Sequence, residues 1–346
     1  MWDIFLTSVN AVVPIILLIV LGYLLKRINF LNPNFVKTGN KFVFRVCLPC
    51  MLFINIYDKM DSFADIRWDV VLYAVVIICV IFGLGLLTAV LTTKKQNRRG
   101  VILQCSFRSN FAIIGLTLVE RLGGDSGIAG IISAFSIPVF NILAVIALSV
   151  FTEEETAEIQ TVKPKHSIKN ILLNIVKNPL IIGVAAGLML VGIREIERAC
   201  CGGEVPFRFD THLKFLYTAV KDVKAIASPL ALVILGGQFE FSAVKGMTKE
   251  IIVGTAWRIV FAPLIGIGIA FLLSEYTNLF SFGPEIYPTL IALFGTPVAV
   301  SSAIMAGEMK SDEQLATQLV VWTSICSIVT IFFTVFILMA CGLLAI

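Results

Sequence analysis

Ten long apolar runs constrain what this chain can fold into more than any other feature of its sequence. They cover residues 8–25, 35–57, 69–92, 100–122, 127–151, 178–193, 215–239, 251–273, 284–305 and 315–346. A helix needs about 20 mostly apolar residues to cross the hydrocarbon core of a bilayer. The strands of a membrane β-barrel would alternate apolar with polar residues, and these runs do not. We therefore predict an all-α polytopic membrane protein with ten transmembrane helices.

The composition excludes two other classes of protein. Charged residues make up 14% of the chain and hydrophobic residues 58%, whereas about 25% of a typical soluble domain is charged. The net charge is only +4, and the Lys and Arg residues are scattered between the apolar runs. A nucleic-acid-binding protein would gather them on one face. The expected surroundings are thus a lipid bilayer, with no nucleic acid as partner.

The loops divide the chain and predict its orientation. The longest polar stretch separates the fifth run from the sixth, which gives a first five-helix repeat over 1–151, a cytoplasmic linker over 152–177 and a second repeat over 178–346. If the first loop is cytoplasmic, alternate loops carry 15 Lys and Arg residues and the opposite loops carry 9. Cytoplasmic loops are the ones enriched in Lys and Arg. We predict a multi-pass protein of the cell membrane with both termini outside.

Because five is an odd number of spans, the second half would enter the membrane with the opposite orientation to the first. The two halves would then form a 5+5 inverted repeat. The second and seventh runs support this interpretation. Each has a Lys eight residues before a proline within the run, Lys41 before Pro49 and Lys221 before Pro229. We expect the two prolines to have a supporting role near the site.

Polar residues lie at the predicted midplane of the fourth and ninth runs. Arg108, Ser109 and Asn110 follow one another about 15 Å from the start of the fourth run, half of a hydrocarbon core about 30 Å thick. Thr296, Pro297, Ser301 and Ser302 lie at a similar depth in the ninth run, which enters from the other side. Paired polar breaks at the midplane are typical of discontinuous helices that bind substrate or ions. The alternative is an ordinary kinked helix whose Ser and Thr bond to the preceding turn.

This pattern predicts which residues contact the substrate. We expect Arg108, Ser109, Asn110, Thr296, Pro297, Ser301 and Ser302 to bind it. Gly115, Thr117 and Pro297 are expected where the two broken helices cross. Replacing Pro297 by alanine should favour an unbroken helix and impair transport more than folding.

The predicted intramembrane charges are cations, namely Arg45, Arg108 and Arg258. A guanidinium in the membrane must face a cavity, carbonyl groups or an anion, and its planar fork matches a carboxylate. The predicted substrate is therefore a small organic anion, with Arg258 and Asn141 supporting the site. No His pair has zinc spacing, and membrane-embedded thiols such as Cys47 and Cys50 pack as small apolar groups. We expect no metal and no cofactor, leave coupling to protons or sodium open, and assign no role to Cys200 and Cys201.

Two other functions remain open from the residues alone. An anion channel would use the same pore residues without alternating access. A membrane prenyltransferase could hold magnesium and a diphosphate with Asp58, Asp61 and Asp65, which follow a D-x-x-D-x-x-x-D spacing. Such an enzyme needs a second acidic cluster, and the remaining Asp residues are single. We expect the chain not to be an enzyme.

The sequence resembles the auxin efflux carrier (PIN-like) family, and its bacterial permeases for dicarboxylates such as malate and malonate in particular. The motifs lie along nearly the whole chain: Val13-Pro-Ile-Ile-Leu-Leu, Phe44-Arg-Val-Cys-Leu-Pro49, Phe107-Arg-Ser-Asn110, Ser228-Pro-Leu-Ala-Leu and Gly295-Thr-Pro297. The resemblance implies crossed, broken helices four and nine. It also implies a bundle that moves in an elevator-like way against a scaffold of helices one, two, six and seven, through which a homodimer could form.

The chain departs from the family pattern at two positions. Thr117 replaces a proline that many members have after the asparagine of the fourth helix, and Ser302 replaces a second proline of plant members. A pocket of the plant type is therefore not expected. A compact bacterial-type permease, a secondary transporter of a mono- or dicarboxylate such as malate or malonate, fits the sequence best.

Overall fold

The computed structural model describes residues 2–60, 66–151, 176–277 and 282–344, and every regular element in these ranges is a helix. The first part contains α1 (Trp2–Arg27), α2 (Pro33–Phe42), η1 (Val43–Cys47), α3 (Leu48–Lys59), α4 (Trp68–Thr92), α5 (Gln96–Phe107), η2 (Phe111–Gly115), α6 (Leu116–Arg121) and α7 (Ser126–Val150). The second contains α9 (Pro179–Cys200), α10 (Phe209–His212), α11 (Lys214–Gln238), η3 (Phe241–Gly246), α12 (Thr248–Ala256), η4 (Trp257–Phe261), α13 (Ala262–Tyr276), α14 (Tyr287–Leu290), η5 (Ile291–Gly295), α15 (Ser301–Glu308) and α16 (Glu313–Ala340). The predicted all-α class is confirmed.

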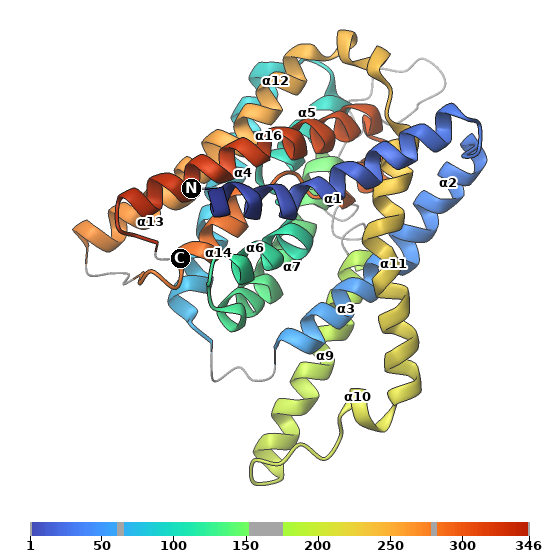
Figure 1. Cartoon of the computed structure of the whole chain (residues 1–346). Helices are drawn as coiled ribbons and strands as arrows, with labels where there is room; N and C mark the ends of the chain where they lie inside the picture. The colour runs from blue at the N-terminus through green and yellow to red at the C-terminus, as the bar shows by residue number, and fades with distance from the viewer. Residues whose placement is uncertain (1, 61–65, 152–175, 278–281, 345–346) are drawn as a thin grey trace, which may run out of the picture.

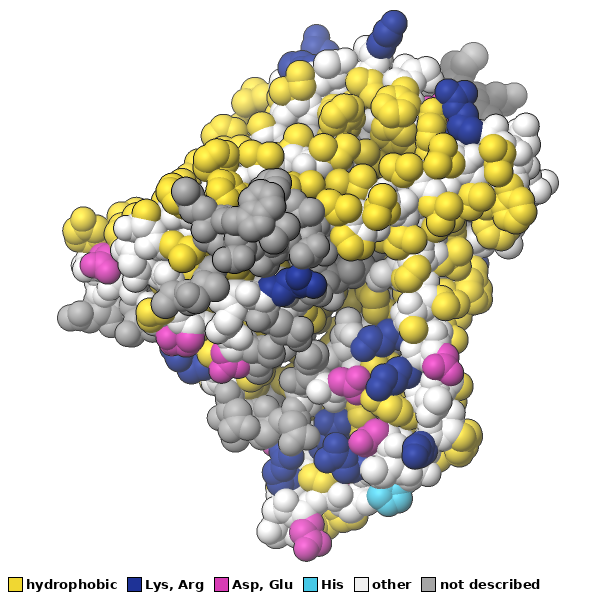
Figure 2. Space-filling view, in the orientation of Figure 1, with side chains coloured by type: hydrophobic (Ala, Val, Ile, Leu, Met, Phe, Trp, Pro, Cys, Tyr) yellow, Lys and Arg dark blue, Asp and Glu magenta, His cyan; other side chains and the backbone are white. Residues whose placement is uncertain are grey.

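Several helices are suited to a bilayer. Among the described residues, six stretches are long and apolar enough to cross a membrane: Pro33–Asp58, Trp68–Thr92, Ile128–Val150, Pro179–Cys200, Thr248–Tyr276 and Glu313–Ala340. Figure 2 shows a broad area of hydrophobic side chains on the surface, with Lys and Arg at its upper edge. Such an apolar surface is stable against lipid tails and costly in water. The predicted total of ten spans in an inverted repeat stays a prediction, and most of the predicted linker lies outside the described residues.

The helices pack in two groups, which Figure 1 shows from one side. The α11 group consists of α1, α2, η1, α3, α9 and α11, with α1 packed along α11 and α3 packed along α9, and α1 also packs against α16 of the second group. The crossing group consists of α4 to α7 and α12 to α16, in which α5 packs on α4 and α7 and α16 packs on α12 and α15. These groups define the two sides of the candidate site.

Two predicted spans are broken near their middle. The fourth run contains α5, then a non-helical segment, then η2 and α6; the ninth contains α14 and η5, a second non-helical segment, and α15. Pro297 has no backbone N–H and so cannot continue the hydrogen-bond ladder of the half-helix before it. Buried residues surround both breaks, including Phe107, Phe111, Phe294 and Val298. The breaks therefore lie inside the protein, away from lipid.

Candidate functional site

The two breaks meet and are joined by backbone hydrogen bonds. The N–H of Asn110 donates to the carbonyl of Pro297 at 2.8 Å, and the N–H of Ala299 donates to the carbonyl of Arg108 at 3.2 Å. Ser109 and Val298 form an isolated antiparallel bridge between these bonds. Non-helical backbone inside a membrane protein needs partners of this kind, since no lipid can supply them. The two broken helices therefore meet at this point, the crossing.

A glycine allows the close approach at the crossing. A Cβ on Gly115 would meet the ring of Phe111, and it would lie 3.3 Å from the carbonyl oxygen of Ala292 in the other broken helix. Gly295 is less constrained, because its Cβ would only touch Ile291 at 3.7 Å. The side chain of Thr117 lies outside the described residues, so its predicted place at the crossing is untested.

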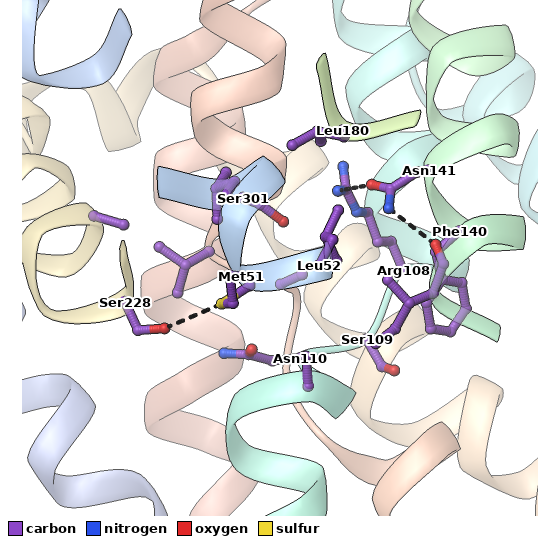
Figure 3. Close-up of a pocket in the computed structure, with 16 residues that line it drawn as sticks. Met51, Leu52, Arg108, Ser109, Asn110, Phe140, Asn141, Leu180, Ser228 and Ser301 are labelled. Carbon is purple, nitrogen blue, oxygen red and sulfur yellow. Dashed lines mark hydrogen bonds between the residues drawn. The ribbon is translucent and has the colours of Figure 1, made fainter. Parts of the chain in front are cut away.

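A small cavity of about 50 Å³ lies beside the crossing, between the two helix groups. Its lining from the crossing group is Arg108, Ser109, Asn110, Ala112, Ile137, Phe140, Asn141, Ala299, Val300 and Ser301. The α11 group contributes Leu48, Met51, Leu52, Leu180, Ser228 and Ala231. Figure 3 shows Met51 and Leu52 between Ser228 and Arg108, with Asn110 beneath them. Since one buried water needs about 10–15 Å³ of such space, the cavity has room for a group of a few heavy atoms.

Arg108 is buried in the wall of this cavity. One guanidinium nitrogen, Nη2, donates to Asn141 Oδ1 at 2.6 Å, and Nη1 contacts the sulfur of Met305 at 3.0 Å. Asn141 in turn donates to the carbonyl of Ile137 at 3.0 Å, which fixes its oxygen toward Arg108. Within the described ranges no carboxylate pairs with this guanidinium, so its positive charge is uncompensated by a side chain. The two partners leave three of its five N–H donors for other groups.

Two more buried polar groups at the break have no partner. They are the hydroxyl of Ser109 and the amide nitrogen of Asn110. A buried polar atom without a hydrogen bond is costly, and native proteins rarely keep one without a functional reason. Both residues line the cavity next to Arg108. The arrangement offers one guanidinium, one amide and one hydroxyl to a bound group.

The other residues predicted to bind substrate are placed differently. Ser301 lines the cavity, whereas Thr296 and Pro297 do not. The Thr296 hydroxyl donates to the carbonyl of Ala292 at 2.8 Å, and Pro297 acts through its own carbonyl. Ser302 has a buried hydroxyl without a partner, but it lies outside the lining. Thr296, Pro297 and Ser302 thus lie behind the cavity, in the crossing itself.

Arg258, predicted as a supporting residue, lies in η4 and is fully buried. Its guanidinium donates to backbone carbonyls of both broken helices, among them Phe107 at 3.1 Å and Phe294 at 2.7 Å. Pro49 packs against Gly183 of α9, so that a Cβ there would meet its backbone. Pro229 lies inside α11, next to the cavity residue Ser228.

Arg45, predicted as an intramembrane cation like Arg108 and Arg258, faces a different cavity from Arg108. Its side chain is 66% exposed and pairs with Glu308 at 3.7 Å. It lines a separate, wide cavity of about 920 Å³, which it shares with Lys26, Arg27, Lys37, Lys41 and Lys310. Sequence position gave its depth along the helix but could not give the face on which it lies.

Sequence reasoning also missed part of the site. Met51, Leu52, Leu180 and Phe140 line the cavity, yet their side chains are as apolar as those of any lipid-facing residue. Ser228 could have been found, since it is a polar residue directly before a mid-helix proline. Its hydroxyl contacts the sulfur of Met51 at 3.8 Å.

A family model described as "Membrane transport protein" matches residues 7–335. The chain belongs to this family. The family is the one that contains the auxin efflux carriers, so the resemblance noted in the sequence is confirmed. The "Uncharacterized transporter YfdV" of Escherichia coli strain K12 is 24% identical over 262 residues, which cover 74% of this chain and 76% of that protein. The protein of the same description from Shigella flexneri matches equally.

In this membrane transport protein Asp58, the first residue of the acidic motif, is held by other side chains. Asp58 accepts a hydrogen bond from the hydroxyl of Tyr217 at 3.0 Å and pairs with Lys224 at 3.9 Å. Asp61 and Asp65 lie outside the described residues. Among the described residues, no three His, Cys, Asp or Glu side chains are grouped as a metal site would require. Family membership and relatives point to a transporter rather than an enzyme.

Proposed function

We propose that this chain is a secondary transporter of a small organic anion, a mono- or dicarboxylate such as malate or malonate. The observation that carries the proposal is the cavity beside the crossing, where Arg108 lies without a carboxylate partner and where Ser109 and Asn110 present unpartnered polar atoms. A guanidinium binds a carboxylate through two parallel N–H bonds, which a spherical anion cannot accept as well. The apolar remainder of the lining suits a short carbon chain.

The half-helix ends support an anionic substrate. Residues 299–301 line the cavity and lead into α15, whose first N–H groups, those of Ser302 and Ala303, donate to the carbonyls of Ala299 and Val300. Such an end carries a partial positive charge and favours a carboxylate. Asn110 and Ala112 bring the start of η2 to the same cavity. Two helix starts and one guanidinium would then surround a single carboxylate.

Transport by alternating access is consistent with the place of the cavity between the two helix groups. We assign the α11 group as the scaffold, because it holds α1, α3, α9 and α11, and the crossing group as the moving bundle. Sliding of the bundle past Leu48, Met51, Leu180 and Ala231 would carry the anion in an elevator-like movement. We further propose ten spans in a 5+5 inverted repeat and a homodimer through the scaffold helices.

The wide cavity of about 920 Å³ that Arg45 lines supports the proposed orientation. Two loops that were both assigned to the cytoplasm meet at this cavity. The first supplies Lys26, Arg27, Lys37 and Lys41 and the last supplies Lys310, and Glu240, Glu308 and Glu313 also line the cavity. Because cytoplasmic loops are enriched in Lys and Arg, we place this cavity on the cytoplasmic side and both termini outside.

Reconstitution tests the function. Purified protein in liposomes is assayed for uptake of radiolabelled malate, malonate and lactate, with and without proton and sodium gradients. The proposal expects saturable uptake of at least one of them, and counterflow when unlabelled anion is inside. Conductance that does not saturate would favour the anion channel instead. Absence of movement of every carboxylate by folded, inserted protein would refute the proposal.

A further inference from the structure

Arg258 makes an unusual set of contacts for a buried cation. Its side chain is 0% exposed, and its three guanidinium nitrogens all donate to backbone carbonyls. Nε donates to Thr296 at 2.9 Å, Nη1 to Phe107 at 3.1 Å and Ser106 at 3.4 Å, and Nη2 to Phe294 at 2.7 Å and Leu293 at 3.2 Å. In the described ranges no carboxylate pairs with it. Five main-chain oxygens thus hold one positive charge.

These oxygens all lie at the C-terminal end of the first half of each broken helix. Ser106 and Phe107 end α5, while Leu293, Phe294 and Thr296 belong to the end of the half-helix formed by α14 and η5. The last carbonyls of a helix have no partner within it. Each such end carries about half a negative charge, so two ends together offset roughly one positive charge. Arg258 therefore neutralises the C-terminal ends, whereas the anion cavity faces the N-terminal starts of α15 and η2.

In transporters with broken helices, the freed carbonyls and half-helix C-terminal ends coordinate the coupling cation. Here a tethered guanidinium already occupies that position. We propose that Arg258 is a built-in cation that takes the place of a coupling ion at the crossing, so that anion transport by this chain does not require sodium. The inference rests on the proposed function, because it concerns the coupling of the same site.

The geometry of the contacts explains why sodium would not displace this group. The five oxygens come from two helices and match a planar fork with five donors, whose shape differs from the compact shell of a small cation. If sodium displaced the guanidinium from these carbonyls, the charge of Arg258 would stay in the protein interior without partners, because the residue is part of η4 and has no exposed surface. A lysine has three donors on a single point and could not reach all five carbonyls.

The first test needs no substrate. Purified wild-type protein is heated in sodium chloride and in choline chloride of equal ionic strength. We expect the same Tm in both salts. Arg258→Ala should have a lower Tm, and guanidinium ions at low concentration should raise it saturably and more than sodium ions do, because their planar shape fits the vacated carbonyl cage. Arg67→Ala removes an exposed guanidinium paired with Asp69 and serves as the charge-matched control without ion dependence.

The second test is uptake of radiolabelled malonate, malate and lactate into liposomes with sodium replaced by choline. We expect wild-type uptake of the transported anion to be equal in both salts. Saturable stabilisation of the wild type by sodium, or uptake that requires sodium, would overturn the role of Arg258 while leaving the transport function intact. No uptake in either salt would refute the transport function, and the Tm comparison would still decide the role of Arg258. If Arg258→Ala does not fold, the wild-type arms decide alone.

Discussion

The N–H of Asn110 donates to the carbonyl of Pro297 at 2.8 Å, and this bond joins two breaks that lie far apart in the sequence. The bond holds the side chain of Asn110 beside the cavity and directs the carbonyl of Pro297 away from its own helix. Residues that lie far apart along the chain are thereby parts of one site. Substitutions can therefore separate the groups that bind the anion from the groups that hold the crossing together.

Arg108 and Asn110 are expected to bind the carboxylate. Removing one partner of a buried charged hydrogen bond costs about 2 to 5 kcal/mol, or roughly 30-fold to several-thousand-fold in affinity. Arg108→Gln and Asn110→Ala should weaken binding of the transported anion by amounts in this range, as measured by saturation of uptake in liposomes. Arg108→Lys should also bind poorly, because it keeps the charge but loses the fork.

The matched control for this prediction is Arg121→Gln, which removes an exposed guanidinium from the other end of the same broken helix. Its affinity should equal that of the parent. If Arg108→Gln and Asn110→Ala proteins fold, insert and bind the anion as tightly as the parent does, the anion site lies elsewhere.

Replacing Pro297 is expected to reduce transport less than the position of this proline in the sequence suggests. In Pro297→Ala the restored N–H would need the carbonyl of Leu293 to rejoin the helix, and Arg258 already donates to that carbonyl at 3.2 Å. The Thr323 hydroxyl also accepts the N–H of Val298 at 3.1 Å and holds the break open. Initial rates of uptake should therefore fall only modestly, with a Tm near that of the parent.

Gly115→Leu should have the larger effect at the crossing. The new side chain would meet the ring of Phe111 and crowd the carbonyl of Ala292, so the two broken helices could not stay in place. Uptake should fall well below that of Gly295→Ala, whose new methyl group makes only an ordinary contact with Ile291. Parental rates in a Gly115→Leu, Pro297→Ala double variant would show that the crossing is not the site.

Sequence alone could locate the breaks, because Arg108, Asn110 and Pro297 are costly in an otherwise apolar helix and need a structural reason. It could name Arg258 as a supporting residue but not its partners, since the carbonyls that bind it come from the ends of α5 and η5, distant in sequence. The residues on the scaffold side of the cavity could not be predicted either, because Met51 and Leu180 are as apolar as lipid-facing residues. The side on which Arg45 lies was also not predictable, because depth along a helix does not determine which face a side chain occupies.

The orientation of the chain can be tested by labelling. Gln96→Cys and Gln160→Cys, each made in a cysteine-free background, should react with an impermeant thiol reagent only after the cells are opened. A variant that keeps only Cys201, which is exposed after α9 in a loop predicted to lie outside, should react in intact cells. Labelling of position 96 or 160 in intact cells would reverse the assignment.

Gly22 and Gly236 are expected to be essential for packing within the α11 group. A Cβ on Gly22 would meet the backbone of Val233, and a Cβ on Gly236 would meet the backbone of Ile19. Each glycine thus lets α1 and α11 approach at the same contact, from opposite sides, as small residues do between membrane helices. Because main-chain atoms cannot yield as flexible side chains do, overpacking here should cost at least about 1–3 kcal/mol.

Gly236→Val should therefore lower the Tm of the purified protein, and Gly22→Val should lower it similarly. Gly83→Ala and Gly192→Ala are the matched controls, since nothing lies within 4 Å of a Cβ at either position. They should leave the Tm unchanged or raise it slightly, because alanine favours a helix over glycine by about 0.5–1 kcal/mol. The effect should extend to transport, since α11 also carries Ser228 and Ala231 into the cavity wall. If Gly236→Val is as stable as Gly192→Ala, then α1 and α11 do not pack through these glycines, and the scaffold must be held together in another way.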